Sequence, residues 1–99
     1  MKRLLLLAIA TVIAISAAAQ DLTVATYNIR NDTKVDRERG EGWAQRCPQV
    51  CRIVQVREFD IFGAQEVKHA QLVDMCNALP EYACVGEGRE GGEKGEYSR

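Results

Sequence analysis

Two side chains with oxygen donors close apolar segments of this sequence. The apolar run 61–64 ends in Gln65 and Glu66, and bounded runs of this length are typical of strands that are buried on both faces. Asn28 ends an earlier segment, 22–28, whose β-branched and aromatic residues also predict a strand. A carboxylate at the end of a buried strand needs a positive partner, a proton or a metal ion. Glu66 is therefore the strongest candidate for a functional residue.

The order strand, helix, strand predicts that these two segments form a parallel pair joined by a right-handed crossover. The carboxyl ends of both strands then lie at one edge of the sheet, where α/β folds bind ligands. Glu66 and Asn28 would offer a carboxylate and an amide oxygen there. This set suits Mg²⁺, which keeps several waters and takes phosphate oxygens as further ligands. The residues thus predict metal-assisted phosphate chemistry. Asn is also common in turns, and spacing alone favours that structural role for Asn28.

Two helices are predicted to support these strands. Residues 43–57 repeat apolar side chains at steps of three and four, as in a helix with one buried face. The apolar face consists of Trp43, Cys47, Val50, Cys51 and Val54, and the outward face includes Gln45, Arg46, Gln49 and Arg52. Pro48 is expected in the first turn, where its missing N–H costs little. A second helix is predicted from about Ala70 to the residue before Pro80, with an apolar stripe of Leu72, Val73, Cys76 and Leu79.

The remaining segments predict loops and one short strand. Residues 31–42 are polar, with charges of both signs and two glycines, and predict a surface loop. Residues 82–85 predict a strand. From Gly86 onward, glycine and charged residues predict a flexible loop, and no Lys-Ser/Thr pair opens a helix after it, as a phosphate-binding Walker loop requires. His69, the single histidine, is expected to be a solvated loop residue without a catalytic role.

Four cysteines leave the disulfide state open. Cys47 and Cys51 are four residues apart on a predicted helix, which favours buried free thiols over a mutual bridge. Cys76 and Cys84 flank a turn that contains Pro80 and could pair, as stapling cysteines do in small exported domains. A zinc site is not expected, because the spacings do not match those of zinc ligands.

The first nineteen residues have the layout of a secretory signal peptide. A basic start, Met1–Arg3, precedes the apolar run 4–15, and Ala17–Ala19 fits a cleavage site before Gln20. The apolar run is too short for a retained anchor, so we expect a secreted or periplasmic product without a stable membrane anchor. Residues 20–99 carry eleven basic and fourteen acidic side chains, a formal charge of −3 with no basic stripe. Charge alone therefore does not suggest a nucleic-acid surface.

Six short motifs follow one another along residues 20–99. They are Thr26–Arg30, Trp43 with Arg46, Asp60–Val67 with Gln71 and Leu72, Leu79–Tyr82, Val85–Arg89 and Gly95–Ser98. In this order they resemble the start of the endonuclease/exonuclease/phosphatase superfamily. That group contains pancreatic-type deoxyribonuclease, neutral sphingomyelinase, inositol polyphosphate 5-phosphatases and poly(A) deadenylases. Each motif is weak by itself, and the specificity comes from their order.

The resemblance implies an α/β fold, namely the N-terminal part of a four-layer α/β/β/α sandwich, incomplete in this chain. It also implies a phosphoesterase that depends on Mg²⁺, or Mn²⁺ in its place. Glu66 matches a direct metal ligand of the family, and Asn28 matches a residue close to the metal. Glu96 matches a carboxylate that orients a catalytic histidine. The substrate would be a phosphate ester, which leaves nucleic acid, a lipid head group, a sugar phosphate or an inositol phosphate open.

The family's catalytic histidine, its Gly-Asp-Phe-Asn-type segment and its terminal Asp-His have no counterpart in this sequence. We therefore expect residues 1–19 to be a signal peptide and residues 20–99 to be the N-terminal portion of a truncated domain that is inactive alone. Two packed sheets need ~200–250 residues, more than the 99 present. The alternative from another class is a short secreted binding module, stapled by Cys76 and Cys84 and without catalysis.

Overall fold

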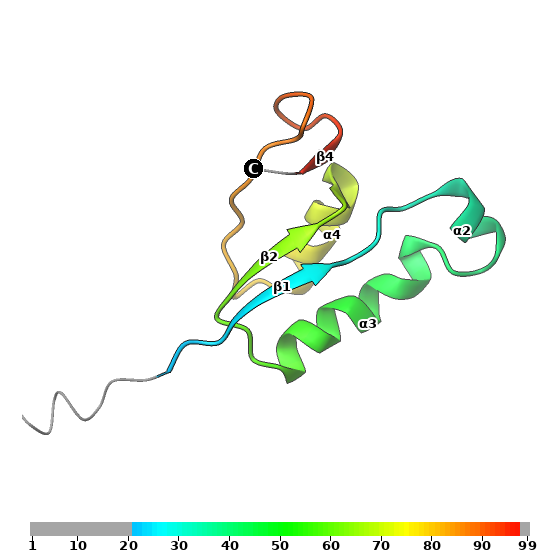
Figure 1. Cartoon of the computed structure of the whole chain (residues 1–99). Coiled ribbons are helices and arrows are strands. Elements are labelled where there is room, and N and C mark those ends of the chain that lie inside the picture. The colour runs from blue at the N-terminus through cyan, green and yellow to red at the C-terminus, as the bar shows by residue number, and fades with distance from the viewer. Residues whose placement is uncertain (1–20, 98–99) are drawn as a thin grey trace, which may run out of the picture.

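The computed structural model describes residues 21–97, and the predicted signal peptide 1–19 lies outside them. This part of the chain combines strands and helices in a mixed α/β unit (Figure 1). The elements are β1 (Val24–Asn28), α2 (Lys34–Glu38), α3 (Trp43–Val56), β2 (Ile61–Gln65), β3 (Val67–Lys68), α4 (His69–Ala78) and β4 (Glu96–Tyr97). None of the helices in residues 21–97 has the length and apolar character needed to cross a bilayer.

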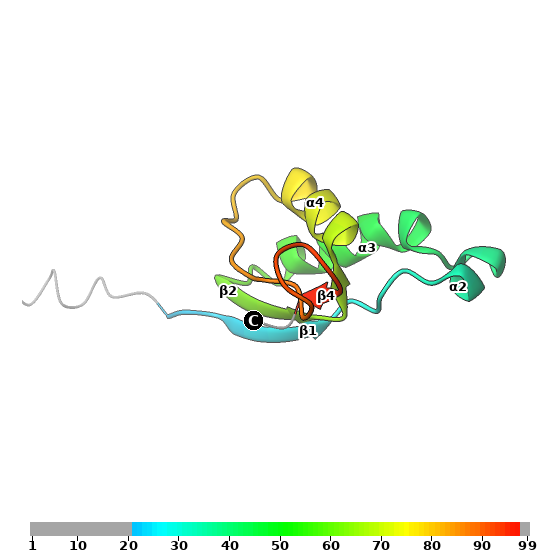
Figure 2. The same ribbon diagram turned by 90° about the horizontal axis from the view of Figure 1, so that it is seen from above.

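The predicted parallel strand pair is present. β1 lies parallel to β2, with Val24 opposite Ile61 and Asn28 opposite Gln65. Figure 2 shows that α3 and α4 both cover one side of this pair. The prediction that the strand is buried on both faces is wrong, because nothing in residues 21–97 covers the opposite side. Val24 and Ile61 remain 67% and 59% exposed there.

The core lies between the strand pair and the two helices. α3 provides its predicted apolar face, and Trp43 is buried as expected. The complete set of buried apolar residues is Ile29, Trp43, Val50, Cys51, Val54, Val67, Met75 and Leu79. Removal of each large apolar side chain from water contributes about 1.5–3 kcal/mol. Packing of this cluster therefore fixes how the helices lie against the ends of the strands.

Two details of the helices differ from the predictions. Pro48 lies in the second turn of α3 rather than in the first, because the helix begins at Trp43. The helix continues through Pro48, which has no N–H to donate to the carbonyl of residue 44. The buried face of α4 is also rotated about the helix axis relative to the predicted apolar stripe. Gln71 and Met75 are buried together with Leu79 just beyond the helix, whereas Val73 is 42% exposed. The core-facing side of α4 thus contains a polar residue.

A short helix interrupts the predicted surface loop 31–42. α2 begins after Thr33, whose hydroxyl accepts a hydrogen bond from the backbone N–H of Asp36, as an N-cap does. Gly42 connects α2 to α3 and is buried, and a Cβ atom at this position would lie 2.8 Å from Arg37 Cγ. The close approach of the two helices therefore requires glycine here.

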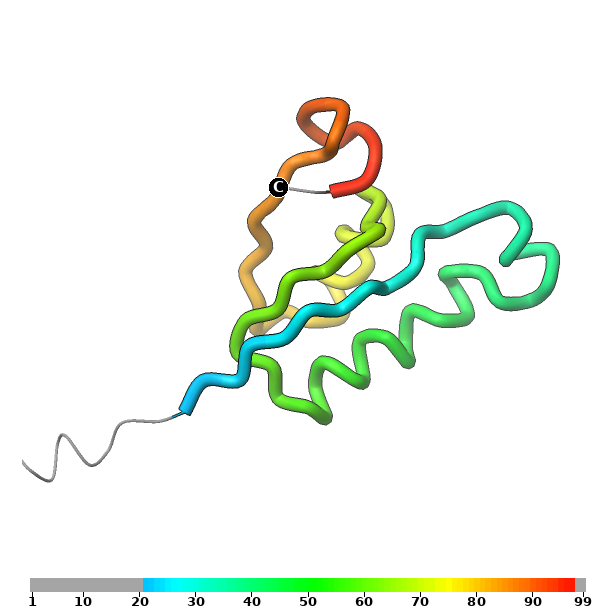
Figure 3. Tube along the Cα trace, in the orientation of Figure 1, coloured from blue at the N-terminus to red at the C-terminus, as the bar shows by residue number. Residues whose placement is uncertain are grey.

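The predicted strand 82–85 is not formed. Tyr82 turns inward, where its hydroxyl donates to the Phe59 carbonyl and its ring packs edge-on against Phe62. The following residues are exposed because no strand of the described chain pairs with them. Figure 3 follows this extended segment from α4 to the glycine-rich loop and back to β4. β4 pairs antiparallel with β3, with Glu96 opposite Lys68.

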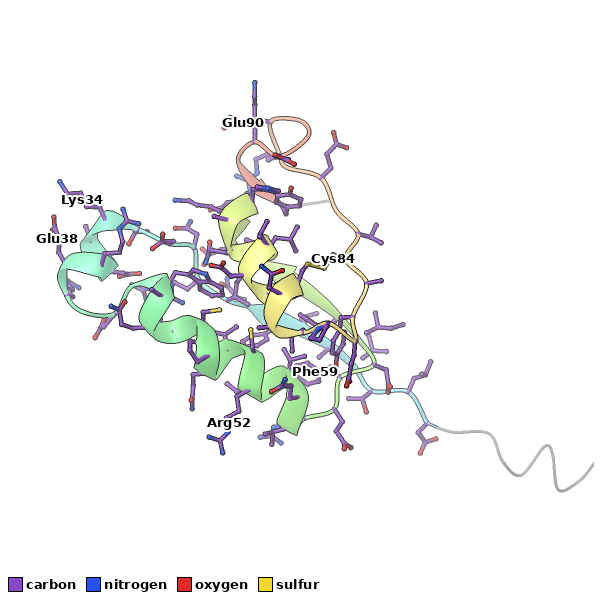
Figure 4. All side chains as sticks on the ribbon, turned by 180° about the vertical axis from the view of Figure 1, so that it is seen from behind. Lys34, Glu38, Arg52, Phe59, Cys84 and Glu90 are labelled. Atoms are coloured by element: carbon purple, nitrogen blue, oxygen red, sulfur yellow. A yellow bond between two sulfur atoms is a disulfide. The ribbon has the colours of Figure 1, made fainter. Side chains whose placement is uncertain are left out.

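Two of the four cysteines form a disulfide and the other two are free thiols. Cys76 on α4 forms a disulfide with Cys84, which lies beside that helix in Figure 4. Cys47 and Cys51 are free, as predicted, with their sulfur atoms 4.0 Å apart. Burial, together with the neighbouring Cys47, raises the pKa of Cys51 to about 12. Both thiols therefore stay protonated and act as apolar core groups.

Candidate functional site at the carboxyl ends of the strands

The carboxyl ends of β1 and β2 lie at the same edge, as the sequence predicts. Asn28 is opposite Gln65, and the ladder continues one step further with a 3.2 Å hydrogen bond from Ile29 N to Gln65 O. Glu66 follows immediately, half-buried and with φ of 61°. A non-glycine residue in this left-handed region is uncommon and often lies at a functional turn. The turn directs the chain sharply from β2 into β3.

The side-chain oxygens of Glu66 and Asn28 differ in the hydrogen bonds that they accept. Within residues 21–97, the Glu66 carboxylate makes no side-chain hydrogen bond or ion pair. The Asn28 Oδ1 atom accepts a 2.9 Å hydrogen bond from the backbone N–H of Arg30. Asn28 therefore has the structural role in a turn that its position in the sequence favours. An amide oxygen has two lone pairs, so this bond leaves one acceptor position of Asn28 for another ligand.

Side chains from both helices hold the loop that follows β1. Arg46 of α3 donates to the carbonyls of Ile29, at 2.7 Å, and Arg30, at 3.1 Å. The prediction that Arg46 faces away from the core is thus wrong, since these carbonyls lie at the end of the sheet that α3 covers. Gln71 of α4 donates to the same Arg30 carbonyl at 3.0 Å. The sequence analysis assigned neither residue a role. Both belong to the six ordered motifs, and that membership was the available signal.

An ion pair fixes the side chain of Arg30. Its guanidinium donates two hydrogen bonds of 2.7 Å to the buried Asp36 carboxylate. These hydrogen bonds and the Arg30 charge hold the pKa of Asp36 below its ordinary value. The pair also raises the pKa of Arg30, to which the more distant charge of Glu66 adds a small contribution. Asp36 is therefore ionised at neutral pH, and Arg30 is held close to the strand ends.

Glu96 reaches the same region from β4. Its Oε1 atom accepts a 2.5 Å hydrogen bond from Asn31 Nδ2, and its Oε2 atom lies 3.6 Å from Arg89 Nη2. An open groove beside β2 is lined by Glu66, Glu96 and Arg89 among other residues. The structure therefore brings Glu66 and Glu96 to one groove. Asn28 is not part of its lining and stands on the neighbouring strand.

His69 is not the loop residue that the sequence predicts. It is the first residue of α4, because the helix begins directly after β3. Its Nδ1 atom lies 2.9 Å from the Tyr97 hydroxyl, and its Nε2 atom lies 3.5 Å from Glu93 Oε2. These contacts connect α4 to β4 and to the glycine-rich loop.

The carboxylate and the amide oxygen at the strand ends are donors of the kind that Mg²⁺ binds. Mg²⁺ is usually held by one or two carboxylates and keeps several waters or substrate oxygens. Within residues 21–97, no three His, Cys, Asp or Glu side chains lie close enough together to hold a metal ion. A cation at Glu66 would therefore have most of its ligands from water, phosphate or residues outside this part of the chain.

Known structures match this arrangement. An endonuclease/exonuclease/phosphatase family protein of Bacteroides thetaiotaomicron matches with a TM-score of 0.75 and 52% identity, over 78% of this chain and 29% of its own. The chain belongs to the endonuclease/exonuclease/phosphatase family. A mannosyl-6-phosphatase of the same organism matches with a TM-score of 0.76 and 52% identity, over 79% of this chain and 30% of its own. A family protein of Bacteroides vulgatus matches with a TM-score of 0.73 and 40% identity, over 80% and 30%.

These matches confirm the resemblance and the fold class. The chain spans about 30% of the length of the endonuclease/exonuclease/phosphatase structures that it matches. Its mixed α/β unit is accordingly an incomplete part of the family's sandwich, and the family is one of phosphoesterase-type hydrolases. No family model matches the chain, and no curated protein matches it.

Proposed function

We propose that this chain supplies the Glu66 end of the active site of a Mg²⁺-dependent phosphoesterase. The observation that carries the proposal is the half-buried Glu66 carboxylate, which makes no side-chain hydrogen bond or ion pair in residues 21–97 and lies in a left-handed turn directly after β2. A charged group in such a position is costly unless a cation compensates it. The family membership supports phosphate chemistry as the purpose of that cation.

Magnesium bound at Glu66, or manganese in its place, would supply a positive charge that stabilises phosphate oxygens during hydrolysis. The chain's own residues would bind and orient. Glu66 would be the direct carboxylate ligand, and Asn28 would lie close to the ion with its remaining acceptor position. The hydrogen bond from Asn31 fixes Glu96, and we propose that Glu96 orients a catalytic histidine that this sequence does not contain.

The substrate class that we propose is a phosphate ester, hydrolysed as a monoester or a diester. One of the similar structures is named a mannosyl-6-phosphatase, which favours a sugar phosphomonoester as the first substrate to test. Nucleic acid, lipid head groups and inositol phosphates are the other members of the class.

We also propose that the protein is exported, because residues 1–19 have the pattern of a signal peptide. The disulfide between Cys76 and Cys84 supports an oxidising compartment. The intact mass of the exported product should correspond to a chain that begins at Gln20. A product that retains Met1 in the membrane fraction would contradict export.

A hybrid enzyme tests the catalytic proposal. In this hybrid, residues 21–97 replace the matching 30% of the Bacteroides thetaiotaomicron mannosyl-6-phosphatase. We expect the hybrid to hydrolyse that enzyme's substrate when Mg²⁺ is present and to lose activity reversibly in EDTA. The unmodified phosphatase is the positive control. A hybrid that folds but shows no metal-dependent hydrolysis would refute the proposal.

The disulfide also favours a second candidate function, a secreted binding module stapled by Cys76 and Cys84. This candidate requires residues 20–99 to fold alone, a requirement that the uncovered face of the strand pair opposes.

A further inference from the structure

We propose that Gln71 is a positioning residue that aligns the loop after Asn28 with the segment after Glu66 at the proposed metal site. This inference rests on the proposed function, since it concerns how Asn28 and Glu66 are held for a cation. Gln71 itself would touch neither metal nor substrate.

Gln71 is almost fully buried, with 1% exposure, and each of its polar atoms has a partner. Its Oε1 atom accepts hydrogen bonds from the backbone N–H of Asp32 at 3.1 Å and from that of Lys68 at 3.2 Å. Its Nε2 atom donates to the carbonyl of Arg30 at 3.0 Å. A buried amide with three such bonds has one defined orientation.

These bonds reach both loops of the candidate site. Arg30 and Asp32 belong to the loop that follows Asn28, whereas Lys68 lies two residues after Glu66. One oxygen atom therefore joins the segment after β1 to the segment after β2. Each of these two segments contains a residue in the left-handed region, since Arg30 and Glu66 both have φ of 61°. Such backbone conformations persist only when the surrounding structure holds them.

The simpler role for Gln71 is a capping residue of α4. Its bond with the N–H of Lys68 is half of a capping box at the start of that helix. A cap needs no contact with Arg30 or Asp32, which are 41 and 39 residues away in sequence. The Arg30 carbonyl already accepts a hydrogen bond from Arg46. It would therefore have a donor even without Gln71. The additional bonds point to the alignment of the two loops.

The test compares two variants of the hybrid enzyme. Gln71→Met keeps the length of the side chain but removes all three hydrogen bonds. Met75→Ala is the matched control, because Met75 is buried in the apolar core one helical turn further along α4 and its side chain makes no hydrogen bond within residues 21–97. We expect both variants to lower the melting temperature in EDTA. Gln71→Met alone should raise the half-saturating Mg²⁺ concentration, by about tenfold, as removal of groups that orient metal ligands does.

Metal binding is read from the rise of the melting temperature with Mg²⁺ concentration, which does not depend on activity. Equal half-saturating concentrations for Gln71→Met and Met75→Ala would reduce Gln71 to a structural cap and overturn the inference. A hybrid whose melting temperature and activity do not respond to Mg²⁺ before any substitution would instead refute the proposed function. The two failures are therefore distinguishable.

A second measurement needs no substitution. In the folded hybrid, the amide hydrogens of Asp32 and Lys68 should show matching protection factors in hydrogen exchange, because both are held by the same oxygen atom of Gln71. Addition of Mg²⁺ should slow both to a similar extent. Independent exchange of the two amides would show that Gln71 does not couple the loops.

Discussion

Replacement of Glu66 by Gln should lower the Mg²⁺-dependent turnover of the hybrid enzyme by about 10²–10³-fold, the range found when one preorganised charge-stabilising group is removed. The two side chains have nearly the same shape, but Gln lacks the negative charge that would bind the cation. In EDTA the melting temperature should stay constant or rise slightly, because the substitution removes a half-buried charge that has no partner in residues 21–97. Parallel measurements of turnover, half-saturating Mg²⁺ concentration and melting temperature check these effects.

The matched control is Glu58→Gln, the same chemical change at an exposed position. Glu58 precedes β2 and thus lies at the opposite end of this strand from Glu66. We expect this control to keep the parent's turnover and metal affinity. If Glu66 were instead a structural carboxylate that pairs with an arginine, Glu66→Gln would mainly lower the melting temperature. Unchanged turnover with a lowered melting temperature would exclude Glu66 as a metal ligand.

The second large effect concerns residues 20–99 alone, which should show no cooperative thermal unfolding. One face of the β1–β2 pair is covered by helices and the other is open, with Val24 and Ile61 more than half exposed. Parallel strands occur almost only in sheets whose two faces are both covered by helices or by a second sheet. The fluorescence of Trp43, which is buried against the helices, should therefore change gradually with temperature rather than in one sharp step.

The disulfide is not expected to replace the missing sheet. Cys76 and Cys84 are only eight residues apart, and a short loop restricts the unfolded chain less than a long one. Reduction of the disulfide should therefore change the unfolding curve little. A sharp transition in the purified fragment that disappears on reduction would favour the stapled binding module over the phosphoesterase.

The local elements that surround the site follow from the sequence. The apolar run before Glu66 and the β-branched segment before Asn28 predicted the two strands and their parallel order. The repeat of Trp43, Val50 and Val54 predicted α3 and its buried face. These features depend on residues that are close together in the chain and on the helical or extended period of the apolar residues. Both can be read from the sequence directly. The ordered motifs added the family and the candidate residue Glu96.

Contacts between distant segments account for most of what the sequence did not predict. The side chains of residues 82–85 predicted a strand. A strand also requires a second strand to pair with its backbone groups, and within residues 21–97 no strand lies beside this segment. The phase of α4 was wrong because a stripe of apolar residues cannot show that Gln71 is buried. Its burial is favourable only through bonds to backbone atoms that are 39 and 41 residues away.

The sequence by itself determined which side chains stand at the ends of the two strands, namely the carboxylate of Glu66 and the amide of Asn28. Only the tertiary structure decided how these groups are held. Arg46 and Gln71 reach the loop after β1 from two different helices, and Asn31 fixes Glu96 across the site. The physical reason is that the side chain's chemical type is local information, whereas the satisfaction of a buried donor or acceptor depends on which distant backbone groups the packed helices bring within hydrogen-bond distance.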